Sequence, residues 1–108
     1  MTDAGIPDGV AVQTIYVVEV SYAADARETR PAVRPEHLSR IAGLLADGRL
    51  IEAGGFTDFS SALFLMPATD AAEAIELIRD DVYMRAGVWI DDLRARPFGR
   101  VVLAPEGK

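Results

Sequence analysis

The stretch that decides the fold is LIEAGGFTDFSSALFLM, residues 50–66. Its two ends, residues 50–56 and 62–66, are mostly apolar, and each is about as long as an ordinary strand. The polar residues 57–61 between them are typical of a turn that joins two paired strands. Pro67 either ends the second strand or limits it to an edge of the sheet. This stretch therefore predicts two paired strands joined by a short turn.

A helix is predicted before this hairpin, beginning at Pro35 and ending at Gly48. Proline is favoured at the first helical position, where its missing N–H costs no hydrogen bond. The preceding residues 23–33 are polar and charged, and they predict a loop. Four apolar residues recur at helical spacing and should form the buried stripe of this helix: Leu38, Ile41, Ala42 and Leu45.

A second helix is predicted after the hairpin. Asp70 followed by Glu73 is a capping-box pattern, which opens a helix. This helix should break at Asp80 and Asp81, and a short turn over residues 82–86 should then end at Gly87. The apolar face of the helix is formed by Ala71, Ala74, Ile75 and Ile78.

Two further strands are predicted outside this helix–hairpin–helix unit. TIYVVEVSY, residues 14–22, is rich in β-branched and aromatic residues and predicts the first strand. VWIDDLRARP, residues 88–97, predicts the last strand, and residues 98–103 predict either a fifth strand or an arm. Residues 1–11 predict a loose tail, so the folded domain should span residues 12–108.

The predicted order βαββαβ is that of the ferredoxin-like class of α+β folds, an antiparallel sheet with two helices on one face. Such helices leave the other face of the sheet open. Apolar residues nevertheless occupy both faces of the predicted strands: Ile15, Val17, Leu63, Phe64, Leu65, Val88 and Ile90. A second sheet should therefore cover the open face, as in a homodimer that forms through the sheet faces.

The composition excludes several classes of function. The 108 residues suffice for one domain, and they carry 11 Lys and Arg against 17 Asp and Glu, a formal charge of −6. This acidic balance argues against nucleic acid as a partner, and no segment is long and apolar enough for a membrane helix. With no cysteine and one histidine, thiolate chemistry and a multi-histidine metal site are excluded. The lack of disulfides and of a secretory signal fits the cytoplasm.

His37 is the only imidazole and is therefore the candidate general base. At the third position of the predicted helix, it would lie near the positive helix end and beside Arg34. Both would favour the neutral ring, which can accept a proton. A surface or capping histidine without a catalytic role explains the same position, and on the residues alone that structural interpretation is the simpler one.

The other candidate residues also have structural explanations. Asp81 can cap the turn that follows it, or it can accept a hydrogen bond from His37 and orient the ring. Spacing alone does not bring the two together. A metal held by His37, Asp80 and Asp81 is conceivable, but adjacent carboxylates are weak evidence for one. Ser60 and Ser61 fit a turn. The aromatic residues that could line a pocket or form core are Tyr22, Phe56, Tyr83 and Trp89.

Several short runs, taken together, resemble the YciI-like (YCII-related) family. They occur in order and with close spacing across residues 14–102. The runs are RPEHL at 34–38, GRL at 48–50, AG at 53–54, DVY at 81–83, RAGV at 85–88 and RPF at 96–98. Val82 and Gly55 depart from the family pattern, because proline is common at both positions. Val82 would loosen the turn that holds Asp81, and Gly55 would widen or soften the floor of the pocket.

The resemblance implies both a fold and a site. Members of the family are small ferredoxin-like proteins that pair into a dimeric α/β barrel, and the family is known for a His–Asp pair proposed as an active site. Carried onto this chain, the pair is His37 and Asp81, which would then meet in a pocket. Ser60 or Ser61 would correspond to a nearby serine discussed for some members.

The leading hypothesis is a cofactor-independent enzyme of lyase or isomerase type, dehydrochlorinase-like, that acts on a small cyclic or phenolic molecule. His37 is its general base, Asp81 orients the imidazole, and Arg34 binds a carboxylate or stabilises an oxyanion. No metal and no cofactor are expected. The substrate-binding candidates are Arg34, Ser60, Ser61, Tyr22, Phe56 and Tyr83. The alternative is a non-catalytic module that holds a small ligand in the same kind of barrel.

Overall fold

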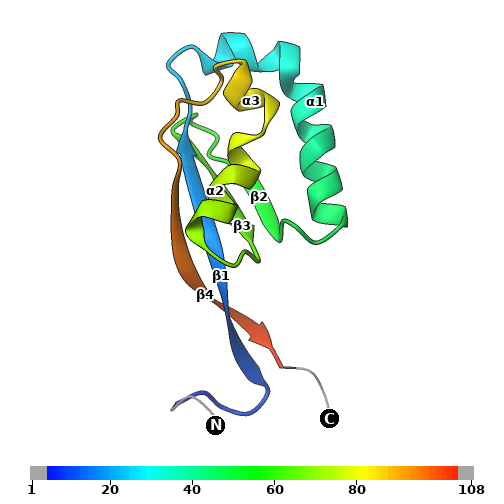
Figure 1. Ribbon diagram of the computed structural model, residues 1–108, viewed down its shortest axis with the longest axis vertical. Coiled ribbons are helices and arrows are strands. Elements are labelled where there is room, and N and C mark those ends of the chain that lie inside the picture. Colours follow the sequence, from blue (N-terminus) through cyan, green and yellow to red (C-terminus); the bar gives the residue numbers. More distant parts are fainter. Residues whose placement is uncertain (1–4, 105–108) are drawn as a thin grey trace.

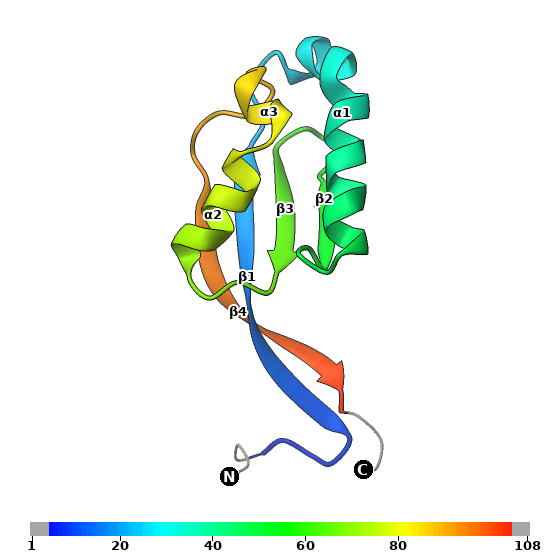
Figure 2. The same ribbon diagram turned by 45° about the vertical axis from the view of Figure 1, so that its right-hand side comes forward.

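The computed structural model describes residues 5–104 and contains a four-stranded antiparallel sheet with helices on one face (Figure 1, Figure 2). The strands are β1 (Val10–Ser21), β2 (Glu52–Gly55), β3 (Ser61–Met66) and β4 (Arg94–Leu103). The helices are α1 (Ala26–Ala46), α2 (Ala71–Arg79) and α3 (Val82–Arg85). The strand order across the sheet is β2-β3-β1-β4. The predicted α+β class with an antiparallel sheet is confirmed.

The core lies between the helices and one face of the sheet. Side chains alternate between the two faces of a strand, so every second residue of β1 and β3 enters this core. Val18 lies opposite Phe64 in the β1–β3 register, and Val20 lies opposite Ala62. All four are buried. The residues between them, such as Val17 and Leu63, therefore face the side that carries no helix.

The predicted hairpin is present with a shorter first strand. β2 pairs with β3 from Glu52 opposite Leu65 to Gly55 opposite Ala62. Leu50 precedes the strand and is buried instead as core. The turn is closed by the Phe56 N–H, which donates to the Ser61 carbonyl at 2.8 Å.

The first helix begins at Ala26 and not at Pro35, so the predicted loop is present only at residues 23–25, and its extension to residue 33 is wrong. Pro31 and Pro35 both lie inside α1. Each removes one backbone donor and crowds the preceding turn, which bends a helix. Figure 1 shows the result, because the first turns of α1 run across the end of the molecule before the helix turns along the sheet.

The buried face of α1 also differs from the predicted stripe. Its buried residues are Ala26, His37, Ile41 and Leu44. Leu38, predicted as core, is 48% exposed, and Leu45 is exposed as well. His37 lies in the middle of the helix, so the predicted influence of the helix end on its ring does not apply.

The second helix and the turn after it begin as predicted. Asp70 accepts a hydrogen bond from the Glu73 N–H at 2.8 Å, and the Glu73 carboxylate accepts from the Thr69 N–H at 2.7 Å. Asp81 is the N-cap of α3. Gly87 follows α3 with a φ of 74°, a left-handed conformation in which glycine carries no steric penalty.

The last strand begins later than predicted, at Arg94 and not at residue 88. The segment before it is irregular and is fixed by an isolated bridge between Tyr22 and Trp89. Residues 98–103 continue the same strand, so there is no separate fifth strand within residues 5–104. β1 begins at Val10, inside the predicted tail, and pairs with β4 as far as Leu103. Residues 1–4 of that tail lie outside the described residues.

The N-terminal end of β1 and the C-terminal end of β4 form a two-stranded arm that extends beyond the rest of the sheet (Figure 1, Figure 2). Val101 and Leu103 on this arm are 71% and 87% exposed. The molecule is correspondingly elongated, with extents of 50 × 25 × 24 Å. No helix within residues 5–104 has the length and hydrophobicity needed to cross a membrane.

Candidate active site: a buried His–Asp pair beside an aromatic cavity

His37 and Asp81 are in direct contact. The Nδ1 atom of His37 lies 2.6 Å from Oδ2 of Asp81. The two residues are 44 positions apart in the chain, and they come from the middle of α1 and from the N-cap of α3. His37 is 7% exposed and Asp81 is 0% exposed. The pair is thus formed by packing between two helices and is shielded from water.

Asp81 also caps α3, so both interpretations of this residue hold at once. Its Oδ2 accepts a hydrogen bond from the Tyr83 N–H at 2.9 Å, and its Oδ1 accepts from Arg40 at 3.1 Å. Burial on its own raises the pKa of Asp81, but the hydrogen bonds from His37, Tyr83 and Arg40 outweigh it and hold that pKa below its ordinary value. The carboxylate is therefore ionised at neutral pH.

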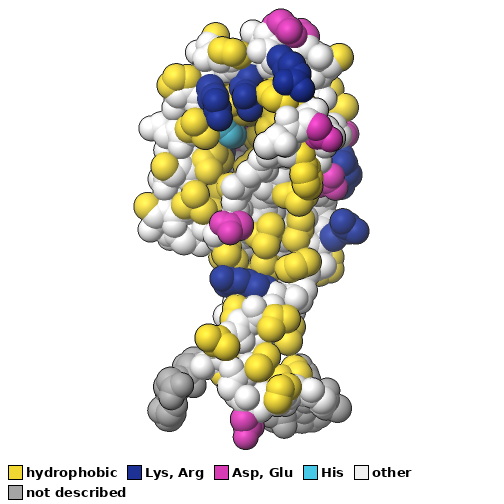
Figure 3. All heavy atoms as spheres, turned by 180° about the vertical axis from the view of Figure 1, so that it is seen from behind, with side chains coloured by type: hydrophobic (Ala, Val, Ile, Leu, Met, Phe, Trp, Pro, Cys, Tyr) yellow, Lys and Arg dark blue, Asp and Glu magenta, His cyan; other side chains and the backbone are white. Residues whose placement is uncertain are grey.

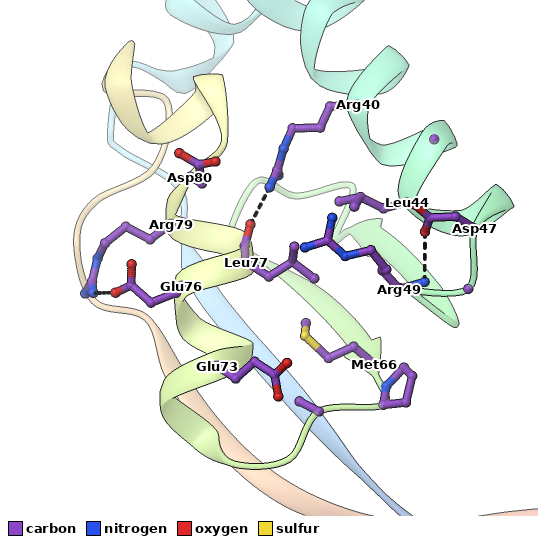
Figure 4. Close-up of a pocket in the computed structure, with 14 residues that line it drawn as sticks. Arg40, Leu44, Asp47, Arg49, Met66, Glu73, Glu76, Leu77, Arg79 and Asp80 are labelled. Atoms are coloured by element: carbon purple, nitrogen blue, oxygen red, sulfur yellow. Dashed lines mark hydrogen bonds and ion pairs between the residues drawn. The ribbon is translucent and has the colours of Figure 1, made fainter.

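Arg40 is a third member of the cluster that the sequence analysis missed. Its second terminal nitrogen, Nη2, donates to the carbonyl of Leu77 at 2.6 Å, which is one of the last carbonyls of α2. Figure 4 shows Arg40 reaching from α1 to this carbonyl. Arg40 therefore links α1 to the junction between α2 and α3. Asp81 lies at this junction. The available signal was the position of Arg40 three residues after His37, on the same helical face.

Aromatic rings fix the plane of the imidazole. The Tyr83 ring stacks on the His37 ring with centroids 3.6 Å apart and planes 9° from parallel. The Trp89 ring meets the imidazole edge-on at 5.5 Å. Nδ1 is taken by Asp81, and the other ring nitrogen, Nε2, has no hydrogen-bond partner within residues 5–104 and is not a buried atom. Nε2 is therefore the nitrogen that a ligand can reach.

A cavity of about 450 Å³ lies beside His37, bounded by α1, the hairpin and the segment around Trp89. It is large enough for a small cyclic molecule. Figure 3 shows the histidine at the bottom of a hollow with basic side chains around it. Four of the predicted substrate-binding residues line this cavity, together with Trp89: Tyr22, Arg34, Phe56 and Tyr83.

Ser60 and Ser61 do not line the cavity. Ser61 is buried at the start of β3, where its hydroxyl donates to the Glu19 carboxylate at 2.8 Å. Ser60 is exposed in the turn, and its N–H donates to Asp58 at 2.9 Å. Both serines therefore have structural partners away from His37, and neither enters the function proposed below.

Gly55 shapes one wall of the cavity. A Cβ atom added at this position would collide with the hydroxyl of Tyr22. The absent side chain therefore leaves space that the Tyr22 hydroxyl occupies, and both residues line the cavity. Where the family commonly has proline, this chain thus has a glycine, and Tyr22 fills the space that the glycine leaves.

A second and larger cavity, of about 920 Å³, lies between α1 and α2 (Figure 4). It shares Arg40 with the cluster around Asp81, but none of the predicted catalytic or substrate-binding residues lines it. Its charged lining is mixed in sign: Arg40, Asp47, Arg49, Glu73, Glu76, Arg79 and Asp80. Within residues 5–104, no three His, Cys, Asp or Glu side chains are grouped so that they could hold a metal ion. We take the smaller cavity as the candidate site because the one imidazole of the sequence lines it.

Comparison with known proteins identifies the family. Residues 14–93 match the YCII-related domain. The chain is also similar to protein YciI of Escherichia coli O6:H1 and of Shigella flexneri. Each is 33% identical over 100 residues, which cover 81% of this chain and 98% of the relative. The chain belongs to the YCII-related family, and the resemblance found in its sequence is confirmed.

A solved structure with a similar fold is 5-chloro-2-hydroxyhydroquinone dehydrochlorinase from Burkholderia phenoliruptrix AC1100, in complex with 2,5-dihydroxybenzoquinone. The TM-score is 0.61 with 15% sequence identity, and the match covers 76% of this chain and 90% of the dehydrochlorinase. At this level of identity the likeness concerns the fold.

Proposed function

We propose that this protein is an enzyme of lyase or isomerase type, in which His37 is the general base and Asp81 orients it. The observation that carries the proposal is the 2.6 Å contact between His37 Nδ1 and Asp81 Oδ2 beside a cavity. With Nδ1–H donated to the carboxylate, the lone pair of the neutral ring lies on Nε2. Such a base contributes roughly 10²–10⁴-fold to a rate.

The charges around the pair favour this assignment. Asp81 is buried as an anion, and Arg40 supplies a compensating cation at 3.1 Å. The pair therefore needs no resting charge on the imidazole. When His37 takes a proton from an acidic O–H or C–H of the substrate, Asp81 stabilises the imidazolium that forms. The electron pair left on the substrate can then expel a leaving group, such as chloride, or shift a double bond.

The walls of the cavity favour a small cyclic substrate. Tyr22, Phe56, Tyr83 and Trp89 present aromatic surface to it, and such surface suits a planar ring. The dehydrochlorinase with a similar fold holds a dihydroxybenzoquinone. That analogy supports a phenolic or quinone-like ring and dehydrochlorination as the reaction to test first, without a bound cofactor.

The experiment is a turnover screen of chlorinated hydroxyquinols, catechols and small lactones with the purified protein. His37→Ala should abolish turnover while the protein still binds the substrate. If the parent protein binds such rings but never turns one over, the chain is instead a small-molecule-binding module.

We also propose that the protein has the ferredoxin-like arrangement of its family and works as a homodimer, which would complete a dimeric α/β barrel. The face of the sheet without helices carries apolar side chains: Val17, Leu63, Leu65 and Phe98. A second sheet would cover them. The absence of cysteine is compatible with the cytoplasmic location that we propose.

A further inference from the structure

We infer that the cavity beside His37 selects a ring that carries a negative charge, and that Arg30 and Arg34 hold this charge. The inference rests on the proposed function only in taking this cavity as the ligand site. It adds the chemical class of the ligand, which is an aromatic or quinone-like anion with a carboxylate or an ionised ring oxygen.

The charged side chains that line the cavity are those of Arg30 and Arg34. His37 lines it as well, and no Asp or Glu does. The chain as a whole has a formal charge of −6, so this is a local reversal of sign. Asp81 does not offset it, because that carboxylate is fully buried and is already paired with Arg40. The cavity therefore attracts anions.

Arg30 and Arg34 form no ion pair within residues 5–104. The cations that do form them with carboxylates are Arg40, Arg79, Arg85 and Arg94. Arg30 is half-buried, so it has lost part of its hydration without gaining a carboxylate. Arg34 lines the cavity as well and also has no carboxylate partner in the described part of the chain. The cavity thus offers guanidinium donors that no carboxylate of this chain occupies.

The guanidinium of Arg30 is already held in place. It lies over the ring of Phe59, with 4.4 Å between its central carbon and the ring centroid, a favourable cation–π arrangement. Arg27 covers the same ring at 4.3 Å, and the Tyr22 ring contacts it at 5.2 Å. Arg34 follows Arg30 by four residues and so projects from the same face of α1. A cation fixed before binding loses little entropy when a ligand arrives.

The two arginines also act on the ring that stacks against His37. Burial raises the pKa of Tyr83, while the charges of Arg30 and Arg34 both lower it. Their field therefore reaches the imidazole side of the cavity, where the reacting atom of a substrate would lie. A charge developing on that substrate would be stabilised by the same groups.

The test is a calorimetric binding comparison of 2,5-dihydroxybenzoate with 2,5-dihydroxybenzamide, which have similar shapes and differ in charge. The acid should bind at least about tenfold more tightly, because hydrogen bonds to charged groups are the stronger ones. Arg34→Gln and Arg30→Gln should each weaken binding of the acid by about tenfold and leave binding of the amide unchanged. Added salt should weaken binding of the acid and leave binding of the amide unchanged.

Arg49→Gln is the matched control, because it removes the same charge from a residue that lines the other cavity. Thermal unfolding of each variant checks its fold, and Arg34→Gln, at an exposed position, carries the test alone if Arg30→Gln does not fold. Equal affinity for acid and amide, no binding of the acid, or an equal loss in Arg49→Gln would overturn the inference. His37→Ala should keep the preference for the acid. If that preference survives while no substrate is ever turned over, the proposed chemistry fails and the anion site stands.

Discussion

At the scale of the residue, the carboxylate of Asp81 accepts hydrogen bonds from donors on both sides of a helix junction. His37 and Arg40 donate to it from α1, and the Tyr83 N–H donates from α3. An N-cap normally satisfies one or two backbone donors. Here the same oxygen that caps α3 also orients the imidazole, so the stability of α3 and the geometry of the proposed base depend on one side chain.

Asp81→Asn is expected to lower the free energy of unfolding by about 3 kcal/mol, because it leaves Arg40 beside a buried neutral amide. The amide would also present an N–H₂ group to donors. Urea denaturation at neutral pH measures the change. Asp80→Asn is the control, since Asp80 is exposed and adjacent. Equal losses in the two variants would show that the buried contacts of Asp81 contribute little.

The same contacts predict a dependence of stability on pH. The pKa of Asp81 is lower in the folded protein than its ordinary value of 3.8, so folding favours the ionised carboxylate. This contribution is complete above the ordinary value and is lost as the pH falls through the lower folded value. Denaturation at several pH values should therefore show the free energies of unfolding of the parent and of Asp81→Asn converging below about pH 4. A difference between these two free energies that stayed constant on acidification would contradict this account.

The residue types of the site could be predicted from the sequence, but the contact between His37 and Asp81 was implied only by the family resemblance. A single histidine in the chain made His37 the only imidazole base, and the family resemblance pointed to Asp81. Their contact depends on how α1 packs against α3, which spacing does not encode. Arg40 escaped notice because an arginine on a helix is usually a solvated surface residue. Its role follows only from the position of the α2 C-terminus.

At the scale of the element, α1 shows where a sound local rule misleads. Proline suits the first helical turn, and this rule predicts a helix start at Pro35. Yet α1 is continuous from Ala26 and contains two internal prolines, whose cost appears as a bend. With a helix start at Pro35, Arg30 falls in the predicted loop. Its place on the same helical face as Arg34 could therefore not be predicted. The hairpin and the capped second helix were predicted correctly, because each is closed by a hydrogen bond between residues that are near neighbours in the chain.

Arg40 joins three helices, so its removal tests the element scale directly. Arg40→Gln is expected to destabilise the fold by about 1–3 kcal/mol, because it removes the guanidinium donor from the Leu77 carbonyl and from Oδ1 of Asp81. Catalysis should fall as well, because Asp81 is then less firmly placed. Chemical denaturation and the turnover rate are the two measurements. Arg49→Gln, at an exposed position just after the same helix, should change neither the stability nor the turnover rate. If Arg40→Gln behaved like this control, Arg40 would not have the proposed role.

At the scale of the whole molecule, the sheet is covered on one side only. Val17 and Leu63 face away from the helices, and the arm carries Val101 and Leu103 beyond any other element. A two-stranded ribbon is only marginally stable in water on its own. The apolar open face and the exposed arm therefore both favour a second copy of the chain as the covering partner.

Leu63→Lys tests this partner, because it places a charge at the centre of the proposed contact between sheets, where burial of an unpaired charge is costly. Light scattering after gel filtration should show a dimer for the parent and a monomer for the variant, with the circular dichroism spectrum unchanged. Ala72→Lys adds the same charge on the exposed side of α2 and should remain dimeric. Val101→Lys then locates the arm: weaker association places it in the interface, whereas unchanged association confines the interface to the sheet. A monomeric parent at high concentration would exclude the barrel and leave the cavity beside His37 to be closed by one chain alone.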